Sequence, residues 1–249
     1  MTACFWAVVP AAGCSHRFGG ELPKQYAPVG GRPLIAWTLL ALLSHRQVAG
    51  AMVALSAQDA LWPGWREIRG KPVLTCVGGR TRAASVLAAL RALPGHVHSD
   101  DFVLIHDAAR PNLSHQDLAA LIKCGCEDSV GALLATPMRD TLKQVGDDGH
   151  VSATLPREQL WRALTPQMFR RLQLIDALSA AMRQGVEATD ESMAMEHSGL
   201  RPLLVEGRED NFKVTLPADL ARFQGVVLSR ARALGGGHGG MASVAVQGA

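Results

Sequence analysis

The first segment of this 249-residue chain whose residues could perform chemistry is the run Pro-Ala-Ala-Gly that begins at Pro10, with Arg17 and Lys24 following. Small residues after a strand let backbone N–H groups approach a phosphate closely, and Arg and Lys add fixed positive charge. The segment therefore predicts a phosphate-binding loop, with an ordinary turn as the alternative. Its spacing matches neither the GxGxxG pattern of dinucleotide enzymes nor the GxxxxGK[ST] pattern of P-loop ATPases.

A second segment of this kind is Gly-Gly-Arg-Thr-Arg over residues 78–82, with Ser85 shortly after. Two consecutive glycines permit close backbone approach to a ligand. Thr81 suits the N-cap of a following helix, a structural role that is compatible with nucleotide contact. Arg82 is expected to join the basic residues that converge on phosphate.

A third segment, His-Asp-Ala-Ala-Arg-Pro over residues 106–111, carries a carboxylate at the end of an apolar run. Mg²⁺ commonly binds one or two carboxylates together with phosphate oxygens. Asp107 opposite a phosphate-binding loop is therefore the predicted ligand of Mg²⁺ or another divalent cation. The alternative for Asp107 is a loop cap or a salt bridge to Arg110.

The elements that must position these segments are short apolar strands alternating with helical patterns. Near-continuous apolar strands separated by helices are typical of an α/β protein whose mostly parallel sheet is covered on both faces. In such sheets ligands bind beyond the carboxyl ends of the strands, where the three segments fall. The predicted strands are 4–9, 50–56, 72–77, 102–105, 130–135 and 202–206, and the predicted helices are 33–43, 81–93, 114–123, 167–184 and 217–234.

One stretch, residues 141–161, breaks this alternation. Two half-polar segments flank the sequence Gly-Asp-Asp-Gly at 146–149, a strong hairpin turn signal. We predict a protruding β-hairpin over residues 139–162, called the arm below, that serves dimerisation or completes a site; a plain surface hairpin is the alternative. Residues 1–234 are expected to form a single domain, and the Gly-rich residues 235–249 a disordered tail.

Composition excludes several classes of protein. The chain has 25 Lys+Arg against 22 Asp+Glu, a net charge of +3, and only 5% aromatic residues, which argues against nucleic-acid binding. No apolar run reaches the roughly 18–20 residues that a membrane span requires, and residues 1–10 lack the pattern of a secretory signal. Five cysteines with a single C-x-C pair predict neither a disulfide framework nor a zinc site. We expect a reduced, cytoplasmic protein.

Seven motifs carry a resemblance to a known family. VVPAAG, GGRTRAAS, HDAARP, PMRDTLK, LWRALTPQ, TDE and DNFKVT occur in the order typical of the 2-C-methyl-D-erythritol 4-phosphate cytidylyltransferases, between about Ala7 and Leu220. PAAG with PKQ marks only the wider nucleotide-sugar-pyrophosphorylase-like group, whereas HDAARP, LTPQ and NxKVT are more specific. The resemblance implies a Rossmann-like three-layer αβα nucleotidyltransferase fold and transfer of CMP from CTP to 2-C-methyl-D-erythritol 4-phosphate in isoprenoid precursor biosynthesis.

The resemblance also implies roles for individual residues. Nucleotide contacts are expected from Pro10, Ala11, Ala12, Gly13, Gly79, Arg80, Ser85 and Ala108. The expected catalytic residues are Arg17, Lys24, Arg157 and Lys213. The acceptor is expected to contact Asp107, Thr141, Arg157, Thr165 and Lys213. In the family the arm carrying Arg157 and Thr165 reaches into the partner subunit's site, which implies a homodimer with exchanged arms.

Two residues depart from the family pattern. Ser15 stands where many relatives have a second glycine, and Arg80 stands where some carry an acidic residue. An arginine cannot accept a hydrogen bond from the cytosine amino group, so cytosine choice would rest on backbone carbonyls. Two other functions remain open: a cytidylyltransferase for another polyol phosphate, such as ribitol 5-phosphate, and a catalytically silent nucleotide-binding protein.

Overall fold

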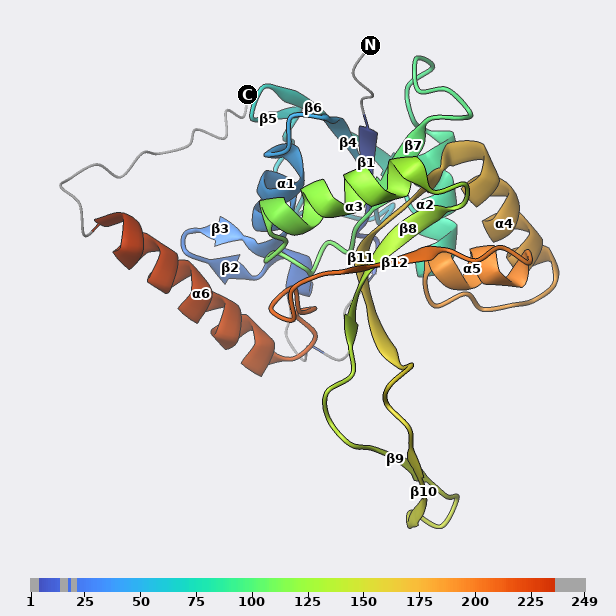
Figure 1. Ribbon diagram of the computed structural model, residues 1–249. Coiled ribbons are helices and arrows are strands. Elements are labelled where there is room, and N and C mark those ends of the chain that lie inside the picture. The colour runs from blue at the N-terminus through green and yellow to red at the C-terminus, as the bar shows by residue number, and fades with distance from the viewer. Residues whose placement is uncertain (1–4, 14–17, 19–21, 236–249) are drawn as a thin grey trace.

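The computed structural model describes residues 5–13, 18 and 22–235, and its centre is a mixed eight-stranded sheet (Figure 1). The strand order is β12-β8-β11-β7-β1-β4-β6-β5. In that order the strands are β12 (Leu203–Glu206), β8 (Gly131–Pro137), β11 (Trp161–Arg170), β7 (Phe102–Ile105), β1 (Phe5–Pro10), β4 (Val48–Leu55), β6 (Lys71–Val77) and β5 (Glu67–Ile68). The pairs β7–β1, β1–β4, β4–β6 and β8–β12 are parallel, so the predicted mostly parallel α/β sheet is confirmed.

Strand β1 shows why its sequence is apolar without interruption. Side chains alternate between the two faces of a strand: Phe5 and Val9 enter one buried cluster, while Trp6 and Val8 enter the other. Helices cover both faces, which gives the expected three layers. The first cluster includes residues of α1 (Leu34–Leu43) and α3 (His115–Glu127), and the second includes residues of α2 (Arg82–Arg91), α4 (Arg171–Arg183) and α5 (Glu191–His197).

The predicted helix over 167–184 is wrong in its first turn. Residues 167–170 belong to β11, which runs antiparallel to both β7 and β8 and fills the space between them. Met168 and Phe169 are fully buried on opposite sides of the sheet, an alternation that a strand requires and a helix would not give. The helix α4 begins only at Arg171.

Smaller elements complete the chain. The 3-10 helix η2 (Lys24–Tyr26) and the two short strands β2 (Pro28–Val29) and β3 (Arg32–Pro33) follow the first loop. The final helix α6 (Pro217–Gly235) packs against this region through Phe223.

Across the described part of the chain, no helix combines the length and hydropathy that a bilayer crossing demands. Residues 236–249 of the expected tail lie outside the described residues.

The arm projects away from the sheet as a two-stranded hairpin (Figure 1). Its strands β9 (Leu142–Val145) and β10 (Val151–Leu155) are antiparallel, and Gly149 in the turn between them has φ +80°. Several apolar side chains of the arm are exposed, with Val145 and Val151 at 65% and 64%. The predicted protruding hairpin is therefore confirmed, and its surface is more apolar than a solvated hairpin needs.

Candidate functional site

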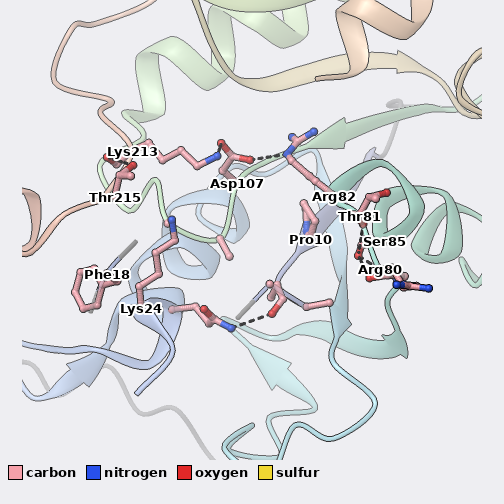
Figure 2. A pocket seen from close by; sticks show the side chains of 17 residues that line it. Pro10, Phe18, Lys24, Arg80, Thr81, Arg82, Ser85, Asp107, Lys213 and Thr215 are labelled. Carbon is pink, nitrogen blue, oxygen red and sulfur yellow. Dashed lines mark hydrogen bonds and ion pairs between the residues drawn. The ribbon is translucent and has the colours of Figure 1, made fainter. Parts of the chain in front are cut away.

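The main pocket lies at the carboxyl ends of β1, β6 and β7 and has a volume of about 350 Å³ (Figure 2). It is where the sequence places its three chemistry-bearing segments. The predicted residues that line it are Pro10, Ala11, Ala12, Gly13, Lys24, Gly79, Arg80, Ser85, Asp107, Ala108 and Lys213. Phe18, Gln25, Thr81, Arg82, Ala109 and Thr215 also line it. Most of these extend the motifs already singled out, and Arg82 is among the residues expected to face phosphate.

The two glycines after β6 are needed for close packing. A Cβ at Gly79 would lie 2.4 Å from the Cβ of Ala84, and one at Gly78 would lie 2.7 Å from the Cβ of Ala12. Real Cβ atoms do not approach that closely, so a side chain at Gly78 would push the second loop, after β6, away from the first loop, after β1. A side chain at Gly79 would push the second loop away from α2. Gly78 thus lets the two loops of the pocket meet, and Gly79 lets the second loop pack against the helix that follows it.

Ser85 fixes the shape of the second loop. Its Oγ accepts a hydrogen bond from the Gly79 N–H at 3.1 Å and donates one to the Thr81 carbonyl at 2.9 Å. The residue is 3% exposed. Because its hydroxyl is engaged with the loop backbone, Ser85 contributes to the pocket through the conformation of residues 79–81.

The first loop is anchored in a similar way. The Ala11 N–H donates to the Ala54 carbonyl at 2.8 Å, and the Ala11 carbonyl accepts from the buried Gln25 Nε2 at 2.9 Å. The N–H of Ala11 is therefore committed to the sheet. The next two residues, Ala12 and Gly13, also line the main pocket.

Asp107 lies at the centre of a cluster of three cationic side chains. Its Oδ1 accepts a hydrogen bond from Arg82 Nε at 2.9 Å. Its Oδ2 accepts from Lys213 Nζ at 3.0 Å and from Arg110 Nε at 3.2 Å. Burial alone would raise the pKa of Asp107, but these three positive charges together hold the pKa well below its usual range.

Behind this cluster, a buried chain of hydrogen bonds holds the Asp107 backbone. His106 Nε2 lies 3.0 Å from the Arg110 carbonyl, which can only accept, so Nε2 carries the proton and Nδ1 is an acceptor. The Thr165 hydroxyl donates to that Nδ1 at 2.8 Å and accepts from the Asp107 N–H at 3.1 Å. Burial is the main cause that lowers the pKa of His106 to about 4, so the imidazole is neutral at pH 7.

The position of Thr165 corrects one prediction. The arm does not carry Thr165, because this residue lies in the sheet part of β11, is 4% exposed, and contacts Asp107 of its own chain. The prediction rested on the family resemblance, which assigns Thr165 to the arm together with Arg157. The structure makes it a support for Asp107.

The two residues expected on the arm side lie apart from the main pocket. Thr141 and Arg157 are exposed, and Arg157 donates a hydrogen bond to the Arg139 carbonyl at the base of the arm. Neither lines the main pocket of its own chain. Arg17 and Ser15 lie outside the described residues.

The remaining expectation concerns a metal. Among residues 5–13, 18 and 22–235, no group of three or more His, Cys, Asp and Glu could hold an ion. Asp107 is the sole carboxylate among the described residues that line the main pocket, and both of its oxygens already accept from cations. These residues do not fit a metal held by protein alone; they fit a polyanion that brings its own cation.

Comparison with known proteins decides the family. The family model described as 2-C-methyl-D-erythritol 4-phosphate cytidylyltransferase matches residues 5–229. The chain belongs to this family. A cytidylyltransferase of the family from Stenotrophomonas maltophilia (strain K279a) is 65% identical over 231 residues, which is 93% of this chain and 100% of the relative. Another, from Xanthomonas euvesicatoria pv. vesicatoria (strain 85-10), is 64% identical over 92% of this chain and 87% of the relative.

Solved structures of cytidylyltransferases have the same fold as this chain. The crystal structure of the 2-C-methyl-D-erythritol 4-phosphate cytidylyltransferase from Thermus thermophilus superposes with a TM-score of 0.74 at 31% identity, covering 92% of this chain and 100% of that one. A 4-diphosphocytidyl-2C-methyl-D-erythritol synthase superposes with a TM-score of 0.77 at 32% identity, covering 91% and 100%. The expected nucleotidyltransferase fold is thereby confirmed.

Proposed function

We propose that this cytidylyltransferase moves CMP from CTP to 2-C-methyl-D-erythritol 4-phosphate, giving 4-diphosphocytidyl-2-C-methyl-D-erythritol and pyrophosphate. The observation that carries the proposal is the cationic cluster around Asp107 beside two small-residue loops. A phosphate monoester is already mostly dianionic near neutral pH, because its second pKa is about 6. The attacking oxygen therefore needs no strong general base. His106 does not line the main pocket, and both of its ring nitrogens are hydrogen-bonded within the protein.

The obstacle to this reaction is bringing two anions together. In-line positioning and fixed positive charge are the means by which such transfers are accelerated. On the nucleotide side, Lys24 and Arg17 would stabilise charge at the α-phosphate, while the N–H groups of Ala12 and Gly13 would face the phosphates. A divalent cation such as Mg²⁺, when bound, would neutralise triphosphate charge, with phosphate oxygens as its main ligands and Asp107 as the one lining carboxylate.

The remaining nucleotide contacts would come from Pro10, Gly79, Arg80 and Ala108. Cytosine would be recognised through backbone carbonyls, since the guanidinium of Arg80 has no acceptor. The Ala108 carbonyl is held by a 2.9 Å hydrogen bond from the buried Thr38 hydroxyl, so its direction is fixed before a nucleotide binds. Such preorganisation reduces the ordering cost of binding.

On the acceptor side, Lys213 and Asp107 supply contacts from one subunit, and Thr165 acts by holding Asp107. Thr141 and Arg157 would come from the arm of a second copy, in a homodimer. What supports this arrangement is that Arg157 lies apart from its own main pocket on an arm with exposed apolar side chains. The planar guanidinium of Arg157 suits a bidentate grip on phosphate.

Replacing Arg157 by Ala should raise KM for methylerythritol phosphate roughly 10- to 100-fold, the cost of a charge-assisted hydrogen bond, while CTP binding stays nearly unchanged. Steady-state pyrophosphate release and calorimetric titration of CTP measure the two effects. Arg183→Ala, an exposed arginine at the end of α4, is the matched control. A rise in the Kd for CTP equal to the rise in KM would contradict the role.

Arm exchange makes a sharper prediction when Arg157→Ala and Lys24→Ala proteins are mixed and allowed to exchange subunits. A mixed dimer then has one intact site, built from the Lys24 of one subunit and the Arg157 of the other. With half of the dimers mixed, and with methylerythritol phosphate kept well below the wild-type KM, about a quarter of wild-type activity should return. If each arm served its own subunit, every site would carry a lesion, and activity would stay at the low level of the two separate variants.

We also propose a cytoplasmic location, where thiols stay reduced. The described cysteines Cys76, Cys124 and Cys126 are free, which supports that compartment.

A further inference from the structure

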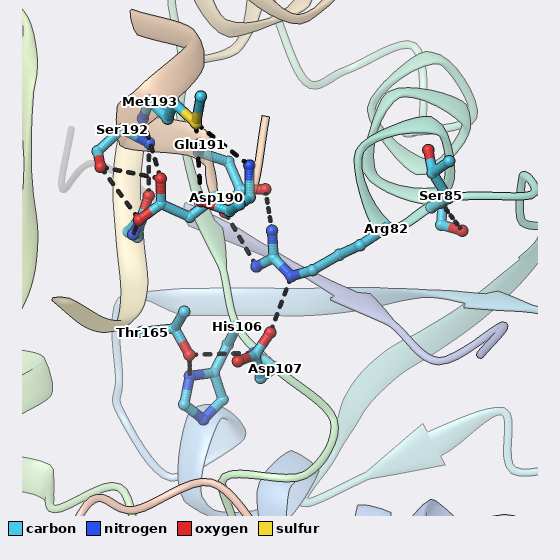
Figure 3. Close-up of polar contacts among 12 residues, drawn as sticks. Arg82, Ser85, His106, Asp107, Thr165, Asp190, Glu191, Ser192 and Met193 are labelled. Atoms are coloured by element: carbon cyan, nitrogen blue, oxygen red, sulfur yellow. Dashed lines mark hydrogen bonds and ion pairs between the residues drawn. The ribbon is translucent and has the colours of Figure 1, made fainter. Parts of the chain in front are cut away.

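Glu191 is a charged residue that neither the motifs nor the proposed reaction assigns a role. It is the first residue of α5 and is 0% exposed. Its Oε1 accepts from Arg82 Nη1 at 2.7 Å, and its Oε2 accepts from Arg82 Nη2 at 3.0 Å (Figure 3). Glu191 itself does not line the main pocket, whereas Arg82 does.

Arg82 connects this buried carboxylate to the reaction site. Its guanidinium faces Glu191 with both Nη atoms and Asp107 with Nε, so the two carboxylates fix its plane. Arg82 is also the one member of the Asp107 cluster that has a second carboxylate partner within ion-pair distance among the described residues. The orientation of the Arg82 guanidinium is therefore determined by Glu191, a residue that does not line the pocket.

A second layer of hydrogen bonds fixes Glu191. Gln167 in β11 is fully buried; its Oε1 accepts from the Ser192 N–H at 2.8 Å and its Nε2 donates to Asp190 Oδ2 at 2.9 Å. Asp190 caps α5 by accepting from the Met193 N–H at 2.9 Å. The first turn of α5 is thus attached to the sheet, and the carboxylate it carries has little freedom to follow a moving Arg82.

Charge explains why this arrangement matters to a phosphate-binding pocket. Arg82, Arg110 and Lys213 carry three positive charges, and Asp107 and Glu191 carry two negative ones. Without Glu191, both Nη atoms of Arg82 would be free to turn toward a bound phosphate or to bind Asp107 in a bidentate manner. Either movement would shift the positive charge of Arg82 relative to Asp107 and Lys213, and so relative to a ligand in the pocket.

We propose that Glu191 is a positioning residue for cytidylyl transfer: by holding the Arg82 guanidinium, it sets the Asp107–Lys213 pair in the geometry that the transition state needs. The inference rests on the proposed function. Because a fixed cluster serves the transition state rather than ground-state binding, its loss lowers kcat more than it raises KM.

The test is a double-mutant cycle with Glu191→Gln, which keeps the size of the side chain and removes its charge, and Arg82→Gln. Glu191→Gln should lower kcat roughly 10- to 100-fold, as a small misplacement of reacting groups does, with KM for CTP changed less than about threefold. In the Arg82→Gln background the same change should cost less than about twofold, because its effect passes through Arg82. Asp128→Asn is the control. This carboxylate accepts from the Val130 and Gly131 N–H groups at the amino end of β8, and Asp128 does not line the main pocket.

A kcat for Glu191→Gln within twofold of wild type, or an equal loss in both backgrounds, would overturn the proposal. If Glu191→Gln does not fold, Glu191→Asp replaces it in the cycle: the charge stays and the carboxylate is withdrawn by one methylene, and the same non-additive loss is expected. Failure of the proposed function gives a different result, since the wild-type enzyme itself would then release no pyrophosphate with methylerythritol phosphate.

Discussion

Replacing Lys24 by Ala should lower kcat for pyrophosphate release on the order of 10²–10³-fold, the usual cost of losing one preorganised charge at a phosphoryl-transfer site. Lys24 begins the short helix η2, and its side chain lines the main pocket next to the first loop. The adjacent Gln25 anchors this helix to the Ala11 carbonyl, so the backbone stays in place when the Lys24 side chain is removed. The free energy of unfolding should therefore change little.

Steady-state kinetics and a denaturant titration measure both quantities for Lys24→Ala. Lys123→Ala is the matched control, since Lys123 is an exposed lysine on α3, apart from the main pocket. A kcat for Lys24→Ala within twofold of wild type would remove Lys24 from the mechanism.

Replacing Asp107 by Asn should lower both the free energy of unfolding and the rate of turnover. Asp107→Asn removes a buried carboxylate that faces three cations. Arg82 keeps its ion pair with Glu191, whereas Arg110 and Lys213 lose the carboxylate that they contact. Leaving buried charges without a partner typically costs about 3–5 kcal/mol of unfolding free energy. Turnover should fall close to background, because Lys213 loses the carboxylate that holds it in the pocket and Arg82 keeps only its contact with Glu191.

The pH dependence of this stability has a definite sign. The folded-state pKa of Asp107 is depressed, so its carboxylate contributes stability above the unfolded pKa of about 3.9 and loses that contribution as pH falls toward the folded pKa. Urea titrations at several pH values should show the difference between wild type and Asp107→Asn constant near pH 7 and shrinking below about pH 4. Asp176→Asn, an exposed acid on α4, serves as the control. A difference below about 1 kcal/mol at pH 7 would contradict the buried cluster.

Much of the fold follows from local sequence. Strands such as β1 and β7 are buried on both faces, so their residues form short apolar runs that are visible without a structure. The rule that ligands bind at the carboxyl ends of such strands then brings together the loops that carry Lys24, Gly79 and Asp107. Those predictions depend only on neighbours along the chain.

Other features depend on contacts that local sequence does not encode. Residues 167–170 of β11 precede a helix directly, and only the gap between β7 and β8 makes them a strand. Thr165 faces Asp107 because of the same sheet order. Glu191 pairs with Arg82 across 109 positions of sequence, so no spacing or periodicity connects the two. The sequence therefore predicts what lines the pocket better than what holds those residues in place.

The most direct test of the proposed function is pyrophosphate release from CTP, measured in parallel with 2-C-methyl-D-erythritol 4-phosphate and with ribitol 5-phosphate, each with Mg²⁺ and with excess chelator. We expect methylerythritol phosphate to be used with a kcat/KM on the order of a hundredfold higher than ribitol phosphate, and chelation to stop the reaction. Equal or better use of ribitol 5-phosphate, or no pyrophosphate with either acceptor in the presence of Mg²⁺, would contradict it.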